Sequence, residues 1–229
     1  MSKPIRFLIV GMINVMALCL ALLLFACPTA AQGTHGHYIF LLAAGFLCEG
    51  NDPASCLAAA RSSQGDTYEM SGAGTFDVQN KLADAVGTFR HKSPDGILLE
   101  TGVWFASELV SFNSYGIDPA ALPRLGLPPD PDAFGRKRLP TSAGQMPTGG
   151  LAVFRVRLLE ISGISRTAVL EVNSALGNVP RERSAEGIRL TLGGSGSDYS
   201  QETGGRAMFL AIRRGAGPSG KGPQREPGC

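Results

Sequence analysis

The chain has 229 residues, of which 44% are hydrophobic and 17% are charged, and its formal net charge at pH 7 is +2. This length and apolar content suit one folded domain with a sizeable core. The 21 basic residues barely outnumber the 19 acidic ones, so the chain lacks the basic excess with which nucleic-acid-binding proteins attract phosphates, and we expect no nucleic-acid partner.

The N-terminus has the layout of a secretory signal. Two basic residues precede a nearly unbroken apolar run from Phe7 to Cys27, and small residues follow it. Thr29 and Ala31 suit the small-residue positions of a signal peptidase site, so we expect residues 1–31 to be removed as a signal peptide.

Two alternatives for this segment remain open. About 20 apolar residues can span a bilayer, so the run is also long enough for an uncleaved membrane anchor. The sequence LFAC, which ends at Cys27, approximates a bacterial lipobox whose cysteine receives a lipid. All three interpretations place the rest of the chain outside the cytoplasm, secreted or periplasmic after cleavage, or membrane-anchored and facing outward. Membrane contact is then expected only through the uncleaved segment or a lipid on Cys27.

The remaining cysteines agree with export. Cys48 and Cys56 are separated by EGNDPAS, a segment rich in turn formers, and an oxidising compartment favours a disulfide between them. Cys229 is left over. The three histidines have no zinc-site spacing with these cysteines, so the sequence predicts no metal site and no cofactor.

Before the first clear strand, two short segments are ambiguous or helix-like. The apolar run 38–47 fits either a buried strand or a short helix. The segment Pro53–Arg61 contains three successive alanines, and a proline is tolerated in a first helical turn. We expect a short helix there.

The first strand-rich block extends from Thr67 to Phe112. Its turn sequence SPDG predicts that Ala85–Lys92 and Ile97–Leu109 pair as an antiparallel hairpin. Two echoing segments, SGAGTF from residue 71 and AVGTF from residue 85, are followed by strand-like residues and not by a helix that could hold a phosphate. Their glycines therefore predict bulges or close backbone contacts within a sheet.

The segment 115–150 interrupts the strand pattern, because it holds 7 of the 15 prolines. We expect no regular element in it and interpret it as an insertion in preference to a lid. Strand patterns resume with Leu151–Leu158, where apolar and charged residues alternate. Three further strands are predicted at 167–172, 187–192 and 206–213, and the polar tail 215–229 is predicted to be disordered. Residues 32–214 thus form one all-β domain, an antiparallel β-sandwich or barrel of about seven or eight strands.

Candidate chemistry is sparse. Glu100, Trp104 and Glu108 are expected on one face of a strand, but the two carboxylates would be about 26 Å apart at ~3.3 Å per residue, too far for a glycosidase pair. Trp104 suits either ligand stacking or the core. His91 is flanked by charged residues, which predicts a solvated side chain. Glu100, Trp104 and His91 remain weak candidates for ligand binding, and no catalytic residue is assigned.

The segment from Thr67 to Tyr115, with TYEMSGAGTF, HKSPDGILLETGVW and ELVSFNSYG, resembles uncharacterised secreted proteins of soil bacteria, and the likeness continues in GGLAVFRVRLL and PRERSAEGIRLTL. The resemblance implies an exported bacterial domain and supplies no site residue. The leading hypothesis is an exported, non-catalytic β-domain that binds an extracellular or cell-envelope ligand or has a structural role there. The alternative is a small secreted hydrolase whose site lies under the proline-rich segment.

Overall fold

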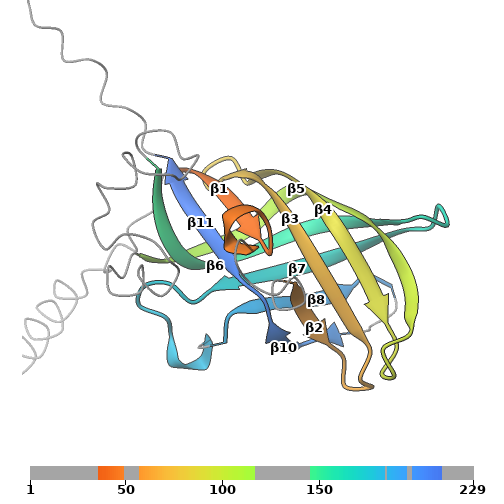
Figure 1. Ribbon diagram of the computed structural model, residues 1–229. Helices are drawn as coiled ribbons and strands as arrows, with labels where there is room; N and C mark the ends of the chain where they lie inside the picture. Colours follow the sequence, from red (N-terminus) through yellow and green to blue (C-terminus); the bar gives the residue numbers. More distant parts are fainter. Residues whose placement is uncertain (1–35, 49–56, 117–144, 184, 195–197, 213–229) are drawn as a thin grey trace, which may run out of the picture. The chain divides into compact units, whose positions relative to one another are not determined.

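Antiparallel strands make up most of the structure (Figure 1). The computed structural model describes residues 36–48, 57–116, 145–183, 185–194 and 198–212, which all belong to the unit His35–Cys229. The expected signal peptide, Cys27, Cys56, the tail and residues 117–144 of the proline-rich segment lie outside the described residues.

The described elements are, in chain order, the strands β1 (His37–Leu42), β2 (Ala58–Arg61), β3 (Thr67–Asp77), β4 (Leu82–Lys92), β5 (Leu98–Gly116), β6 (Gln145–Glu160), β7 (Ser165–Ser174), β8 (Gly187–Leu192), β9 (Asp198–Tyr199), β10 (Gln201–Gly204) and β11 (Ala207–Ile212). Two short 3-10 helices, η1 (Gly45–Cys48) and η4 (Arg181–Arg183), lie between strands. No helix among the described residues is both long and apolar enough to cross a membrane.

The strand pairs follow a path that returns to its starting strand. In order around this path, β1 pairs with β3, β3 with β4, β4 with β5, β5 with β6, β6 with β11, and β11 with β1. The remaining strands add to it: β7, β8 and β9 follow on from β6, and β2 and β10 follow on from β3. The all-β, antiparallel prediction is therefore confirmed. The described sheet has 11 strands where seven or eight were expected, and the additional ones are the short strands β2, β9 and β10.

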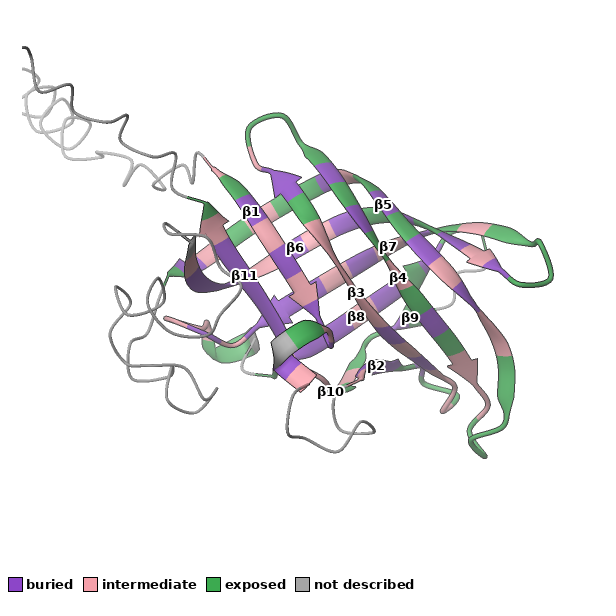
Figure 2. Ribbon diagram, turned by 45° about the horizontal axis from the view of Figure 1, so that its top comes forward, coloured by how far each residue is buried: buried purple, intermediate pink, exposed green. Residues whose placement is uncertain are grey.

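The buried residues of these strands form an apolar core. Figure 2 shows buried positions interspersed with exposed and intermediate ones along the strands. In β6 the predicted alternation is confirmed, since Ala152, Phe154, Val156 and Leu158 are buried and the arginines between them are exposed. Aromatic rings fill the part of the core near β1, where Tyr38 stacks on Phe76 with ring centroids 5.1 Å apart. The alternating pattern thus determines which face of each strand the core covers.

The predicted hairpin is confirmed as β4 and β5, which pair in antiparallel register. The turn is closed by a 2.9 Å hydrogen bond from the Gly96 amide to the Ser93 carbonyl. Gly96 has a φ of 79°, a left-handed conformation that glycine adopts without steric cost. The turn sequence therefore determined this pairing correctly.

The two echoing glycine segments pair with each other across β3 and β4. Gly72 lies opposite Gly87, and Gly87 lies opposite Trp104 on β5. The indole packs against both glycines, because a Cβ added to Gly72 would lie 2.4 Å from indole atom Cζ2 and one added to Gly87 would lie 2.5 Å from indole atom Nε1. The indole nitrogen donates a 3.0 Å hydrogen bond to the Ser71 carbonyl. The expectation of close contacts within a sheet is confirmed.

The helix expected over Pro53–Arg61 is wrong for its described C-terminal part, which is strand β2. Ala58 and Ala60 are fully buried, and they pair with Met70 and Tyr68 of β3. The small alanine side chains let β2 pack closely against the core, and this tertiary packing overrides the helix propensity of alanine. The ambiguous run 38–47 divides into strand β1 and the beginning of η1.

Strands extend into the proline-rich segment from both sides. β5 continues to Gly116 and β6 begins at Gln145, so the expectation of no regular element is wrong for these ends. Pro147 lies opposite Leu210 of β11. Proline is tolerated there because, among the described strands, β6 pairs at that position with β11 alone, and β5 joins it from Gly149 onward.

Candidate functional site

His91 and Glu100 lie directly opposite each other on β4 and β5. Both side chains point inward, and the His91 Nδ1 atom is 3.6 Å from Glu100 Oε2. The structure thus brings together two of the three candidate residues. Trp104 is separate from them, fully buried among core residues such as Phe40, which leaves its ring no exposed face for a ligand.

Four further side chains lie with this pair on the inward face, at the same end of the sheet. We call the set of six the polar cluster; its members come from β3, β4, β5, β6, β7 and β9, and they are Tyr68, His91, Glu100, Glu160, Arg166 and Tyr199. The first five are on the inward face of their strands, because buried core residues lie two or four positions away from them, and Tyr199 is itself buried. The cluster therefore replaces the apolar core where these strands end.

Glu100 has partners on both carboxylate oxygens. Arg166 donates a 3.0 Å hydrogen bond from its guanidinium to Oε1, and the Tyr68 hydroxyl lies 3.5 Å from Oε2. Arg166 also pairs with Glu160, at 3.0 Å from Nε to Oε1, and the Ser162 hydroxyl donates to the other Glu160 oxygen at 2.9 Å. One arginine thus holds two carboxylates.

The His91 ring is enclosed by two tyrosines. It stacks on the Tyr68 ring with centroids 4.4 Å apart and an interplanar angle of 10°, and the Tyr199 hydroxyl lies 3.2 Å from Nε2. Only 12% of the His91 side chain is exposed, so the prediction of a solvated histidine is wrong. The flanking Arg90 and Lys92 do not predict its environment, since alternate residues of a strand face opposite sides.

Burial controls the protonation of the cluster's two phenols. It raises the pKa of Tyr68, and the negative charge of Glu100 adds to this effect. Burial also raises the pKa of Tyr199, with further contributions from the charges of Asp66 and Glu100. Both tyrosines therefore stay neutral around pH 7. A nucleophilic hydroxyl needs the opposite arrangement, a depressed pKa or an adjacent base with access to a substrate.

The sequence predicted that Glu108 shares a face with Glu100 and Trp104, and this prediction is wrong. A register shift between Ala106 and Glu108 breaks the alternation of β5. Leu109 is consequently buried, and Glu108 is instead half exposed and pairs with Arg155 on β6 at 2.7 Å. A bulge of this kind changes the face to which the next side chains point, until a further register shift between Leu109 and Ser111.

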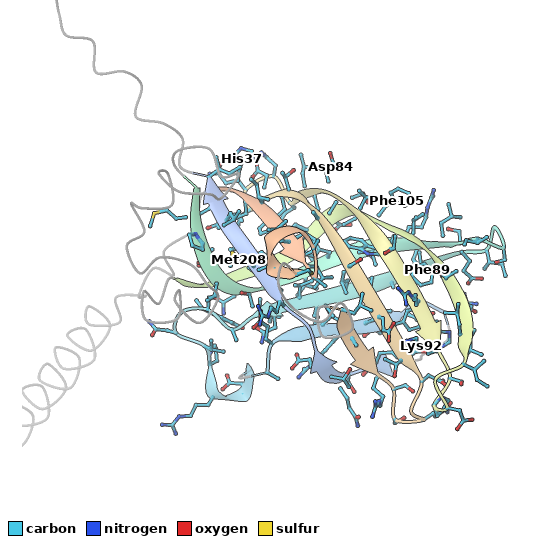
Figure 3. The ribbon with its side chains drawn as sticks, viewed as in Figure 1. His37, Asp84, Phe89, Lys92, Phe105 and Met208 are labelled. Carbon is cyan, nitrogen blue, oxygen red and sulfur yellow. The ribbon has the colours of Figure 1, made fainter. Side chains whose placement is uncertain are left out.

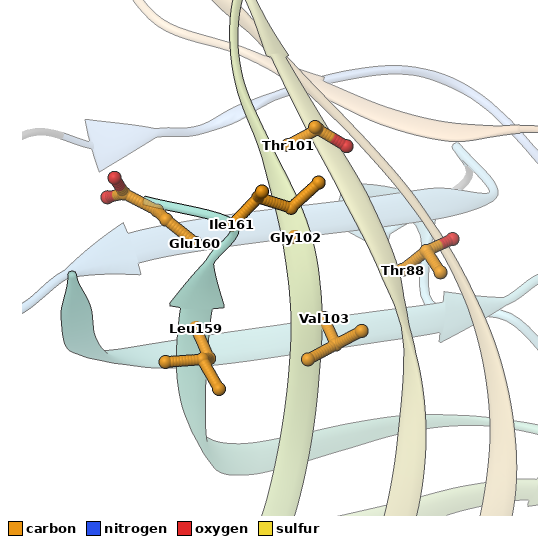
Figure 4. Close-up of a pocket in the computed structure, with 7 residues that line it drawn as sticks. All are labelled: Thr88, Thr101, Gly102, Val103, Leu159, Glu160 and Ile161. Carbon is orange, nitrogen blue, oxygen red and sulfur yellow. The ribbon is translucent and has the colours of Figure 1, made fainter. Parts of the chain in front are cut away.

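An apolar groove crosses the outer face of β4, β5 and β6 (Figure 4). It has a volume of about 360 Å³, and its lining residues are Thr88, Thr101, Gly102, Val103, Leu159, Glu160 and Ile161. In Figure 4 the Glu160 carboxylate points away from Thr88 and Val103. The groove thus offers apolar contact area and little convergent polar chemistry.

A second depression, which we call the outer polar hollow, lies near the turns that join β2 to β3 and β4 to β5. It has a volume of about 330 Å³, and charged and hydroxyl side chains line it, among them Arg61, Thr67, Glu69, Lys92 and Thr203. Neither His91 nor Glu100 lines this hollow or the apolar groove. The candidate residues of the sequence therefore do not face either depression.

No group of three or more histidine, cysteine, aspartate or glutamate residues within the described part of the chain is arranged to hold a metal ion. Comparisons of the chain with protein-family models, with curated proteins and with solved structures found no match. The function must therefore be inferred from the geometry above.

Proposed function

We propose that this chain is an exported, non-catalytic β-domain that acts by binding, or as a structural component of the cell envelope or its surroundings. The observation that carries the proposal is the polar cluster. Its acid, base and hydroxyl groups contact one another, and five of the six side chains line neither depression. Glu160 borders the apolar groove, but Arg166 and Ser162 hold its carboxylate.

The alternative, a small secreted hydrolase, would use His91 as a base and a neighbouring hydroxyl as a nucleophile. Two features argue against it. The hydroxyl next to His91 belongs to Tyr199, which is only 3% exposed. Burial also raises the pKa of this phenol. An active site needs a concave space in which such groups converge on a substrate.

We further propose that the strands form an antiparallel barrel. The closed circuit of pairs from β1 through β3, β4, β5, β6 and β11 supports this architecture over a sandwich of two separate sheets. In such a barrel the polar cluster closes one end through hydrogen bonds, and aromatic packing fills the other. Its outer surface is then the part available for a ligand.

The export part of the proposal predicts a specific mass for the protein isolated from its native host. Mass spectrometry of the intact chain should match Gln32–Cys229, with Cys48 and Cys56 protected from thiol alkylation until the protein is reduced. The reason is that signal peptidase removes residues 1–31 and an oxidising compartment forms the disulfide.

Other masses would contradict this prediction in distinct ways. A full-length mass would indicate a retained membrane anchor, and an added lipid on Cys27 would indicate a lipoprotein. A full-length protein recovered from the cytoplasm, with both cysteines alkylated before reduction, would overturn export itself.

A further inference from the structure

The outer polar hollow has the construction of a small-ligand site. Residues of β2 and β3 line it, and so does Lys92 at the end of β4. Pro94, in the turn after β4, packs against the turn at Gly65, where an added Cβ would lie 3.1 Å from Pro94 Cβ. Two turns thus meet to form one wall. At about 330 Å³ the hollow is at the lower end of the range of ligand pockets, roughly 300 to 1,000 Å³.

Glu69 provides the hollow with an unsatisfied acceptor. Lys92 pairs with its Oε1 atom at 2.5 Å, whereas its Oε2 atom is buried and has no hydrogen-bond partner. Leaving a buried acceptor unsatisfied costs about 1 to 3 kcal/mol, and more for a charged group. A ligand that donates a hydrogen bond to Oε2 would remove this cost.

Positive charge borders the same hollow. Arg61 is exposed at the end of β2, and no ion pair joins it to any described residue. A guanidinium offers five N–H donors, and an ammonium offers three, of which Lys92 uses one on Glu69. The hollow therefore combines a carboxylate acceptor with two cationic donor groups.

We propose that the outer polar hollow binds a small zwitterion of the α-amino-acid type. Its ammonium group would donate to the Glu69 carboxylate, turned so that Oε2 faces the hollow, and its carboxylate would accept hydrogen bonds from Arg61 and Lys92. The residues that line the hollow include no aromatic ring, so it lacks the flat apolar face on which a sugar ring stacks. This inference rests on the proposed binding function, since it names the ligand class of that function.

The test uses L-alanine as the probe, with ethylamine and propionate as probes that each keep only one of its two charged groups. Each is titrated into the isotope-labelled protein, expressed with its N-terminal segment and processed by export, and backbone amide shifts are followed by NMR. L-alanine should cause saturable shifts at Thr67, Glu69 and Thr203. Ethylamine and propionate should bind at least tenfold more weakly, because each lacks one of the two charged contacts.

Three variants test which side chains contact L-alanine. Glu69→Gln and Arg61→Gln should each weaken L-alanine binding at least tenfold. Asp84→Asn is the matched control, because Asp84 is an exposed carboxylate at the opposite end of β4 from Lys92 (Figure 3). The affinity of this variant for L-alanine should equal that of the wild type. The amide spectrum of each variant reports whether the fold is retained.

Saturable shifts at the hollow that both Gln variants weaken support the proposal. Equal affinities for the three probes, or no shifts in the hollow with any of them, would overturn the ligand class. Those results would leave the non-catalytic assignment standing, because it depends on the polar cluster. Saturable shifts at His91 and Tyr199, and none at the hollow, would overturn both the proposed ligand class and the non-catalytic assignment.

Discussion

Replacing Trp104 with alanine is expected to lower the free energy of unfolding by about 3 to 5 kcal/mol, the usual cost of deleting a large buried aromatic side chain. The indole is fully buried and packs against two glycines that have no side chain with which to fill the cavity. The substitution also removes the donor to the Ser71 carbonyl. Urea denaturation followed by far-ultraviolet circular dichroism measures the effect, since the variant has no tryptophan.

Phe105→Ala is the control for this substitution. Phe105 is the next residue of β5, but it faces outward and is 42% exposed, so its truncation should cost less than about 1 kcal/mol. The two substitutions remove similar aromatic side chains from adjacent positions. Equal losses of stability at the two positions would contradict the assignment of Trp104 to the core.

Gly87→Ala should lower the free energy of unfolding by about 3 kcal/mol or more, near or above the upper end of the usual cost of overpacking. The added Cβ would lie 1.9 Å from the Ser71 carbonyl oxygen and 2.5 Å from the indole nitrogen. Backbone and ring both block it, so either β3 and β4 separate or the indole leaves its position. The same denaturation experiment, now with tryptophan fluorescence as a second signal, measures the loss.

The same change at Gly36 is the control. There the added Cβ would lie 3.4 Å from the Tyr38 ring, an ordinary contact distance, and the free energy of unfolding should change by less than about 0.5 kcal/mol. If Gly87→Ala were as mild as Gly36→Ala, the close approach of Trp104 to the paired glycines would be wrong.

Local signals in the sequence were sufficient for much of the fold. The SPDG turn determined the pairing of β4 with β5, because its proline and glycine favour one tight turn. The alternation in Leu151–Leu158 determined the buried face of β6. These predictions succeeded because a turn and a pleat depend on residues that are close in the sequence.

Predictions failed where distant contacts decide the structure. Alanines favour a helix in isolation, but Ala58 and Ala60 are buried against β3 in a strand. The bulge after Ala106 was not visible in the residues of β5 alone, and it turned Glu108 outward. Such outcomes depend on neighbouring strands that a single sequence does not reveal.

The polar cluster could be predicted only in part. Glu100 and His91 were recognised as candidates, and the predicted hairpin places them near each other. The partners Tyr199 and Arg166 are 108 and 66 residues away from His91 and Glu100, respectively. No spacing rule links residues so far apart, and the pairing of several strands brings them together.

The central claim is that the polar cluster belongs to the fold and is not a reaction site, and an alkaline titration tests it most directly. A raised pKa means that the folded state favours the neutral phenols of Tyr68 and Tyr199. Their contribution to stability is therefore fully present below the ordinary tyrosine pKa of about 10 and is lost as the pH rises through the folded-state pKa. The absorbance of tyrosinate and the circular dichroism are recorded together, with Tyr68→Phe and Tyr199→Phe to assign the signals. We predict that these two phenols ionise only as the fold is lost. An accessible or activated hydroxyl would instead ionise at a pH of about 10 or below. Such an ionisation of either phenol in the intact protein would contradict the claim.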